Sequence, residues 1–140
     1  MIRPDAEQDM ATAQPEAASH IILLAEDDDE MRTLLKAYLE MAGYAVTAVP
    51  NGVEVIRVIC EEGTVPDVLV TDVHMPLMSG LEVLRRLGET EKAPPTIIIT
   101  SFGDHETHKR ARKLGAASVL DKPFDSTTLL GAVKDVLEQP

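Results

Sequence analysis

Short apolar runs and amphipathic stretches alternate along most of the chain. Five of the runs are too short for helices, and runs of this kind are typical of strands covered on both faces. They lie at residues 21–25, 44–49, 68–70, 96–100 and 118–120. A stretch with helical spacing of its apolar residues follows four of the runs, and a polar helix is expected after the run at 96–100. Five strands alternating with five helices predict an α/β domain with a parallel sheet, right-handed crossovers and helices on both faces.

Several of the expected helices have recognisable ends. Apolar residues within 31–39 recur at helical spacing, and Gly43 ends this first helix. Ser79 and Glu82 have the spacing of a capping box at the start of the third helix. Asp125 is placed to cap the last helix. The two remaining helices are expected over residues 50–63 and 104–114.

Length and composition indicate one globular domain preceded by a tail. The chain has 140 residues, the usual size of one domain, and 44% of them are hydrophobic. Residues 1–19 contain two prolines and no apolar period, so we expect a flexible N-terminal tail there and the domain over residues 20–140. Cys60 is the single cysteine. We expect it to be a buried thiol in a helix, because it cannot form an internal disulfide.

The charge of the chain narrows the classes of partner. Lys and Arg number 13 against 24 Asp and Glu, which gives a formal net charge of −11. This excess repels phosphate backbones and anionic lipid heads, so we expect no direct binding to nucleic acid or to a membrane. No apolar run approaches the roughly 18 residues of a membrane span, and the N-terminus lacks the apolar core of a secretory signal. A cytoplasmic location is therefore expected.

Chemically active side chains stand at the ends of four of the five runs. Glu26 and Asp27 follow the first run, Asp72 the third and Lys122 the fifth, while Thr100 ends the fourth. The carboxyl ends of parallel strands meet at one edge of a sheet, where ligands bind in folds of this class. We therefore expect these side chains to share a small volume at that edge.

The charges expected at this edge favour a divalent cation. Glu26, Asp27 and Asp72 bring three negative charges, and Lys122 returns one positive charge. An uncompensated excess at a partly buried site either raises carboxyl pKa values or is neutralised by a bound cation. A few carboxylates with water are typical ligands of Mg²⁺. Such a site tolerates a phosphoryl group, and Asp72 can act as the nucleophile that forms an acyl phosphate.

Four segments together resemble the receiver domain of two-component response regulators. They are LLAEDD at 23–28, VLVTDVHMPLMSG at 68–80, IIITS at 97–101 and KPF at 122–124. The resemblance covers about residues 20–138, with its segments in order at the ends of strands one, three, four and five. It is consistent with a flavodoxin-like fold, a doubly wound five-stranded parallel sheet in the order 2-1-3-4-5.

The resemblance implies a role for each residue at the sheet edge. Asp72 is the implied phosphoryl acceptor, Thr100 the switch hydroxyl that turns toward the phosphoryl group, and Lys122 the partner of a phosphoryl oxygen. The implied Mg²⁺ ligands are Glu26, Asp27, Asp72 and the backbone carbonyl of His74. Asp27 is the more direct of these ligands, and Glu26 acts largely through water. A cis peptide bond is expected between Lys122 and Pro123.

The function implied by the resemblance is a phosphorylation-dependent signalling switch. A histidine kinase or a histidine phosphotransfer protein supplies the phosphoryl group. The switched form then signals through a conformational change to an output protein in another chain. Such a domain assists its own phosphorylation and dephosphorylation, and it is not a turnover enzyme.

Two positions depart from the family pattern, and two histidines need an explanation. Val119 stands where the family often has Tyr or Phe, and an aliphatic side chain cannot swing like a ring. Asp121, beside Lys122, is also unusual.

His105 and His108 lie one helical turn apart. Because no third metal ligand accompanies them, we expect both on a solvated helix face.

Three other functions compete with the signalling switch. A flavoprotein with the same sheet order needs a phosphate-cradling loop and aromatic residues, but the loop here is EDDDE and only 3% of residues are aromatic. A phosphatase with an aspartyl nucleophile has a second acid two residues later, where His74 stands. A degenerate receiver binds partners without being phosphorylated. The presence of Asp27, Asp72, Thr100 and Lys122 argues against it.

Overall fold

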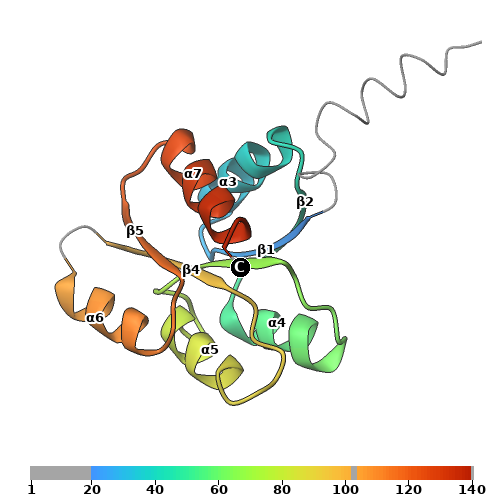
Figure 1. Cartoon of the computed structure of the whole chain (residues 1–140), viewed down its shortest axis with the longest axis vertical. Helices are drawn as coiled ribbons and strands as arrows, with labels where there is room; N and C mark the ends of the chain where they lie inside the picture. Colours follow the sequence, from blue (N-terminus) through green and yellow to red (C-terminus); the bar gives the residue numbers. More distant parts are fainter. Residues whose placement is uncertain (1–19, 102–103, 140) are drawn as a thin grey trace, which may run out of the picture.

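A parallel sheet of five strands runs through the centre of the computed structural model, which describes residues 20–101 and 104–139 (Figure 1). Its strand order is β2-β1-β3-β4-β5, and all neighbouring strands are parallel. This confirms the predicted doubly wound α/β fold in the order 2-1-3-4-5. The strands are β1 (Ile21–Ala25), β2 (Ala45–Val49), β3 (Val68–Asp72), β4 (Thr96–Ser101) and β5 (Ser118–Lys122). The tail expected over residues 1–19 lies outside the described residues.

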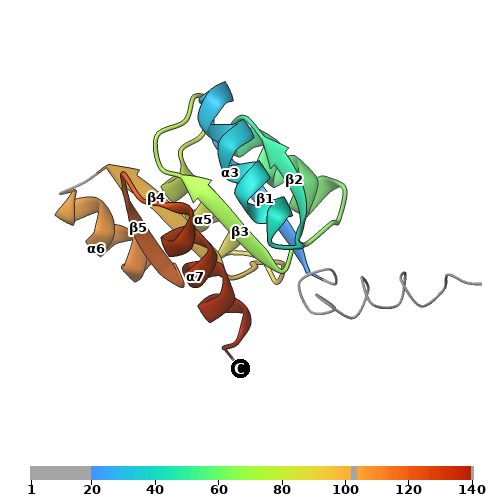
Figure 2. The ribbon, with the colours of Figure 1, turned by 90° about the horizontal axis from the view of Figure 1, so that it is seen from above.

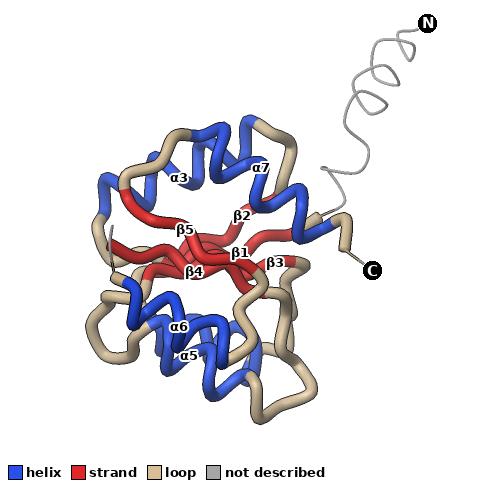
Figure 3. The backbone as a smooth tube through the Cα atoms, turned by 60° about the vertical axis from the view of Figure 1, so that its left-hand side comes forward, coloured by secondary structure: helices blue, strands red, loops and turns tan. Residues whose placement is uncertain are grey.

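Helices cover both faces of the sheet (Figure 3). One face carries α3 (Asp29–Met41) and α7 (Ser126–Leu137), which lie over the strands when the molecule is seen from above (Figure 2). The opposite face carries α4 (Gly52–Ile56), α5 (Gly80–Leu87) and α6 (His105–Lys113).

A hydrophobic core forms on each side, because successive side chains of a strand point to opposite faces. Leu35 of α3 and Leu129 of α7 pack with Val70 on one side, and Val83 of α5 packs with Leu69 on the other. Each such side chain contributes roughly 1.5–3 kcal/mol when it is fully buried.

Five helices begin at a residue whose side chain accepts an N–H group from the first turn. These N-caps are Asp28, Asn51, Ser79, Asp104 and Asp125. Ser79 accepts from the N–H of Glu82 (3.2 Å) and Asp125 from that of Thr128 (2.9 Å), so both residues are N-caps as predicted. The carboxylate of Glu82 pairs with Arg85 and Arg86, so the reciprocal half of the predicted capping box is not formed.

The second helix differs from the prediction in its last turn. It continues from α4 into a π-helical turn, η1 (Arg57–Glu61), in which the N–H of Glu62 donates to the carbonyl of Arg57 (2.9 Å). A π turn holds more residues than an α turn, so it shifts which residues face the core. Val58 and Ile59 are buried, whereas Cys60 is half-buried. The expectation of a buried thiol is therefore wrong.

Strands β3 and β5 each extend two residues beyond the predicted apolar runs. Asp72 of β3 pairs in register with Ile99, and Lys122 of β5 pairs with Ser101. The sheet itself therefore fixes the backbone of two charged residues.

No helix of the described part of the chain combines the length and the apolar character needed to cross a bilayer.

Candidate functional site

The loop after β1 holds one buried and one exposed carboxylate. Glu26 is only 1% exposed, and its N–H donates to the carbonyl of Val49 on β2 (3.1 Å). Its Oε2 accepts from the N–H of Asp28 (3.1 Å). Asp27 is exposed, and its carboxylate makes no hydrogen bond to another described residue. The buried carboxylate is thus committed to protein contacts, whereas the exposed one is free to bind a ligand.

Arg32 holds this loop against α3, a contact that the sequence analysis missed. Its guanidinium donates to the backbone carbonyl of Glu26 (2.9 Å) and to the side chain of Asp29 (2.6 Å). Because the contact is made to a backbone oxygen, the only signal in the sequence is an arginine one turn into the helix.

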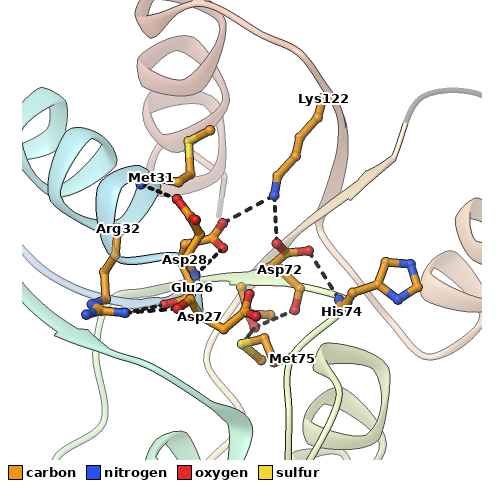
Figure 4. A network of polar contacts seen from close by, with 10 residues as sticks. Glu26, Asp27, Asp28, Met31, Arg32, Asp72, His74, Met75 and Lys122 are labelled. Atoms are coloured by element: carbon orange, nitrogen blue, oxygen red, sulfur yellow. Dashed lines mark hydrogen bonds and ion pairs between the residues drawn. The ribbon is translucent and has the colours of Figure 1, made fainter.

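Asp72 lies at the carboxyl end of β3, near the middle of the sheet (Figure 4). The residue is 5% exposed. Its Oδ2 accepts a hydrogen bond from Nζ of Lys122 (2.7 Å), and its Oδ1 accepts from the backbone N–H of His74 (3.2 Å). Figure 4 shows the His74 ring turned away from the carboxylates, so only the backbone of His74 takes part. Both oxygens of Asp72 are therefore held in a defined orientation.

Lys122 reaches from β5 across β4 to two buried carboxylates. Its Nζ lies 2.7 Å from Oδ2 of Asp72 and 3.3 Å from Oε1 of Glu26. Burial acts to lower the pKa of Lys122, but the two carboxylates outweigh this effect and raise it above its ordinary value. The ammonium group therefore stays charged. The peptide bond between Lys122 and Pro123 is cis, as the sequence analysis predicted.

The pKa of the Glu26 carboxyl group is raised well above its ordinary value. Burial raises its pKa to about 7, and the charge of Asp72 adds to this effect, while the Asp28 N–H and Lys122 act in the opposite direction. In the metal-free protein a part of the Glu26 carboxyl groups therefore keeps its proton near neutral pH. The sequence predicts that an excess of negative charge at this site raises carboxyl pKa values, and the raised pKa of Glu26 agrees with this prediction.

Three carboxylates at this edge have the donor set of a magnesium site. One oxygen from each of Glu26, Asp27 and Asp72 lies within 4.8 Å of the others. Asp27 is exposed and its carboxylate has no partner among the described residues, which suits a direct ligand. Glu26 is only 1% exposed, and its raised pKa disfavours the charged form that binds an ion directly, which suits contact through water. Asp28 is not part of the set, because its Oδ2 caps α3 at the N–H of Met31 (2.8 Å). The residues present therefore fit a Mg²⁺ ion.

Thr100 places a hydroxyl group without a partner close to these charges. It is fully buried at the end of β4, and its Oγ1 has no hydrogen-bond partner among the described residues. Leaving a buried hydroxyl unsatisfied costs about 1–3 kcal/mol. Strand alternation puts it on the same face as Ile98, which packs against Ala111 of α6. This hydroxyl is available to donate to an acceptor that arrives at the sheet edge.

One of the two histidines on α6 does not behave as expected. His105 is exposed, but Nε2 of His108 lies 2.6 Å from Oδ1 of Asp121 on β5. The expectation of a solvated face is therefore wrong for His108, because the rotation of α6 about its axis turns residue 108 toward the sheet. The sequence shows that Asp121 is unusual beside Lys122, but it does not identify His108 as its partner.

Gly80 provides the close approach that α5 makes to the acceptor strand. A Cβ atom at this position would collide with the backbone carbonyl oxygen of Asp72. The N–H of Gly80 donates to the carbonyl of Val73 (2.9 Å). The absence of a side chain at residue 80 therefore allows the start of α5 to pack directly beneath Asp72.

Comparisons with known proteins agree on one family. The family model described as "Response regulator receiver domain" matches residues 22–134. The chemotaxis protein CheY of Halobacterium salinarum is 34% identical over 116 residues, which make up 83% of this chain and 95% of that protein. The C4-dicarboxylate transport transcriptional regulatory protein DctD of Pseudomonas aeruginosa is 35% identical over 129 residues, which make up 92% of this chain but only 28% of that protein. A solved receiver domain protein from Clostridium thermocellum has a TM-score of 0.78 at 30% identity, covering 84% of this chain and 94% of that one.

Proposed function

The chain belongs to the response regulator receiver domains of two-component systems, and we propose that it is a phosphorylation-controlled switch whose phosphoryl acceptor is Asp72. The observation that carries the proposal is the set of contacts around this carboxylate. An ammonium group lies 2.7 Å from one of its oxygens, and two further carboxylates lie beside it. These surroundings suit a carboxylate that must receive an anionic group. The ammonium of Lys122 supplies one positive charge, and the neighbouring carboxylates can bind Mg²⁺, which supplies more.

In the proposed reaction a carboxylate oxygen of Asp72 attacks the phosphorus of a phosphohistidine on a histidine kinase or phosphotransfer protein. The new O–P bond forms as the P–N bond breaks, and the imidazole nitrogen keeps the electron pair of that bond. The N–H of His74 and the ammonium of Lys122 orient the carboxylate beforehand. As the phosphoryl group arrives, Nζ of Lys122 stops donating to the carboxylate of Asp72 and donates to a phosphoryl oxygen instead. The added negative charge is therefore paired at once.

Asp27, Asp72 and the backbone carbonyl of His74 are the proposed direct ligands of Mg²⁺, with Glu26 acting through water. When bound, the ion neutralises charge on the phosphoryl oxygens. Without a divalent cation, the carboxylates repel an incoming anion and Glu26 keeps part of its proton. These residues make phosphorylation of Asp72 depend on a divalent cation.

Thr100 provides the proposed link between phosphorylation and a change of shape. Its buried hydroxyl has no partner within the described residues, so it gains a hydrogen bond by turning toward a phosphoryl group on Asp72. Helix α6 is the next element along the chain and packs on the same face of the sheet. A movement at Thr100 is therefore expected to reach α6, where an output partner can sense it.

The relatives support a signalling role without naming one partner. One is a chemotaxis protein, and another is a transcriptional regulatory protein of which this chain spans 28%. Transcriptional regulation is therefore a property of the longer relative as a whole, and we do not extend it to this chain. The proposed switch accepts one phosphoryl group for each molecule and acts by binding, not by turnover.

Intact mass spectrometry tests the proposal with acetyl phosphate as the phosphoryl donor. We expect the wild type to gain one phosphoryl group with Mg²⁺ and none with EDTA. Asp72→Asn should gain none. The matched control is Asp67→Asn, because Asp67 bonds to the N–H of Ile21 at the opposite edge of the sheet, and it should label like the wild type. Labelling of Asp72→Asn, or multiple turnover of a phosphomonoester by the wild type, would contradict the proposed function.

A further inference from the structure

A single side-chain contact connects α6 to the edge strand β5. Nε2 of His108 lies 2.6 Å from Oδ1 of Asp121. A carboxylate can only accept a hydrogen bond, so the imidazole donates through Nε2–H. Within the described residues, no other side chain of α6 forms a hydrogen bond or ion pair with β5. The orientation of α6 against this strand therefore depends strongly on one donor and one acceptor.

The apolar packing beneath α6 is sparse. Ala111 is its only buried residue within the described part of the chain. Leu114, just after the helix, and Val119 of β5 are partly buried beside it. Burying one alanine removes little apolar area from water, and hydrophobic stabilisation is roughly proportional to that area. Within the described residues, the contact between His108 and Asp121 is the polar contact that complements this apolar packing.

Asp121 lies between two residues of the phosphorylation site. In the register of the sheet it pairs with Thr100 of β4. The next residue along β5 is Lys122, whose Nζ contacts Asp72. Strand alternation directs Asp121 toward α6 and Lys122 toward the carboxylates. Asp121 is therefore one peptide unit from Lys122 and one strand pairing from Thr100.

We propose that the contact between His108 and Asp121 is a latch that holds α6 in the resting arrangement, so that both are positioning residues for the switch. This inference rests on the proposed function. The latch is closed in an arrangement in which the hydroxyl of Thr100 is buried and has no partner. When Thr100 turns toward the phosphoryl group, α6 shifts and the latch opens. The latch therefore opposes switching, and its removal makes the switched arrangement easier to reach.

Beryllium fluoride measures how easily the switched arrangement is reached, because trifluoroberyllate binds a carboxylate oxygen and beryllium then has the tetrahedral shape and negative charge of a phosphoryl group. The experiment is a calorimetric titration of the full chain with beryllium fluoride in Mg²⁺. We expect His108→Ala and Asp121→Ala each to bind about three- to tenfold more tightly than the wild type, the range that the net contribution of one ordinary, partly exposed hydrogen bond supports. The double variant should bind no more tightly than either single variant, because both remove the same contact.

Two further variants make the test specific. His105→Ala alters the exposed histidine one turn away on α6, and it should bind like the wild type. His108→Gln keeps an N–H donor at the end of the side chain, and it should restore an affinity close to that of the wild type. The side chains of His108 and Asp121 are 22% and 36% exposed, so the alanine variants leave the core intact.

The outcomes separate the latch from the proposed function. Alanine variants that bind beryllium fluoride with wild-type affinity or more weakly, or whose effects add in the double variant, overturn the latch. A contact with only a structural role lowers stability in both arrangements equally and leaves the affinity unchanged. If the wild type binds no beryllium fluoride in Mg²⁺, the proposed function itself fails, and this result is seen before any variant is compared.

Discussion

Nζ of Lys122 lies 2.7 Å from Oδ2 of Asp72, so a side chain of the edge strand β5 reaches across β4 to the end of β3. The two residues are 50 positions apart in the chain, and the register of three parallel strands brings them together. The same ammonium lies 3.3 Å from Glu26 on β1's loop. The charge balance of the site therefore depends on the sheet being correctly assembled.

Replacing Lys122 by methionine is expected to lower the stability of the metal-free protein by about 1–2 kcal/mol. The substitution leaves two buried carboxylates without their cation, and the partial exposure of Lys122 keeps the effect below that of a fully buried pair. Urea unfolding in EDTA measures this loss. Mg²⁺ should then stabilise Lys122→Met more than the wild type. Lys134→Met on the exposed side of α7 is the control, and an equal loss in the two variants would contradict the pairing.

Mg²⁺ is expected to raise the thermal stability of the wild type, because an ion that binds only the folded state stabilises it. Asp27→Ala should abolish most of this gain, since Asp27 has the exposed, uncommitted carboxylate of the cluster. Glu30→Ala removes a nearby exposed carboxylate at the start of α3 and should keep the full response. Thermal melts with Mg²⁺ and with EDTA provide the comparison. Identical Mg²⁺ responses of the two alanine variants would disprove the ligand assignment.

Glu26 is expected to make the metal-free protein less stable as pH rises toward neutrality. Burial raises its pKa in the folded state to about 7, so the folded state binds a proton that the unfolded state has already released. Between the ordinary pKa of glutamate, about 4.3, and about 7, the free energy of unfolding therefore falls, by a total of order 3 kcal/mol. Glu26→Gln lacks this titration. Urea unfolding in EDTA across this range should show the variant gaining stability relative to the wild type, and parallel curves would refute the prediction.

Gly80→Ala is expected to destabilise the protein by about 1–3 kcal/mol, the usual range for forcing extra volume into a packed site. The new Cβ would collide with the backbone of Asp72, which cannot move without disturbing β3. Gly131→Ala is the matched control, because a Cβ at that exposed position on α7 meets nothing within 4 Å. In that helix alanine should instead stabilise by roughly 0.5–1 kcal/mol. Chemical denaturation measures the free energy of unfolding of both variants, which should fall for Gly80→Ala and rise for Gly131→Ala; a fall of equal size in both would contradict the prediction.

The fold and most of the site residues were predictable because they depend on strand patterning and strand ends. Five apolar runs predicted a parallel sheet, and the carboxyl ends of parallel strands meet at one edge, which predicted that Asp72 and Lys122 come together. The runs were predicted to stop at residues 70 and 120. Hydrophobicity cannot show that charged residues continue the backbone pairing, as they do in β3 and β5.

Other contacts were not predictable from spacing. Helix α6 is polar, so it has no apolar stripe to indicate which side faces β5, and the partner of His108 depends on that rotation. Arg32 acts on a backbone carbonyl, and a backbone acceptor leaves no residue type in the sequence to identify it. The π turn at Arg57–Glu61 similarly changes the face that Cys60 presents without altering the apolar pattern.

The central claim is that the carboxylate of Asp72 forms the acyl phosphate. Borohydride reduces an acyl phosphate of aspartate to homoserine, so peptide sequencing by mass spectrometry after phosphorylation and reduction identifies the acceptor directly. The account predicts homoserine at position 72 in protein treated with donor and Mg²⁺, and unmodified aspartate there when Mg²⁺ is removed by EDTA. Homoserine at position 27 or at any other aspartate, with residue 72 unchanged, would contradict it.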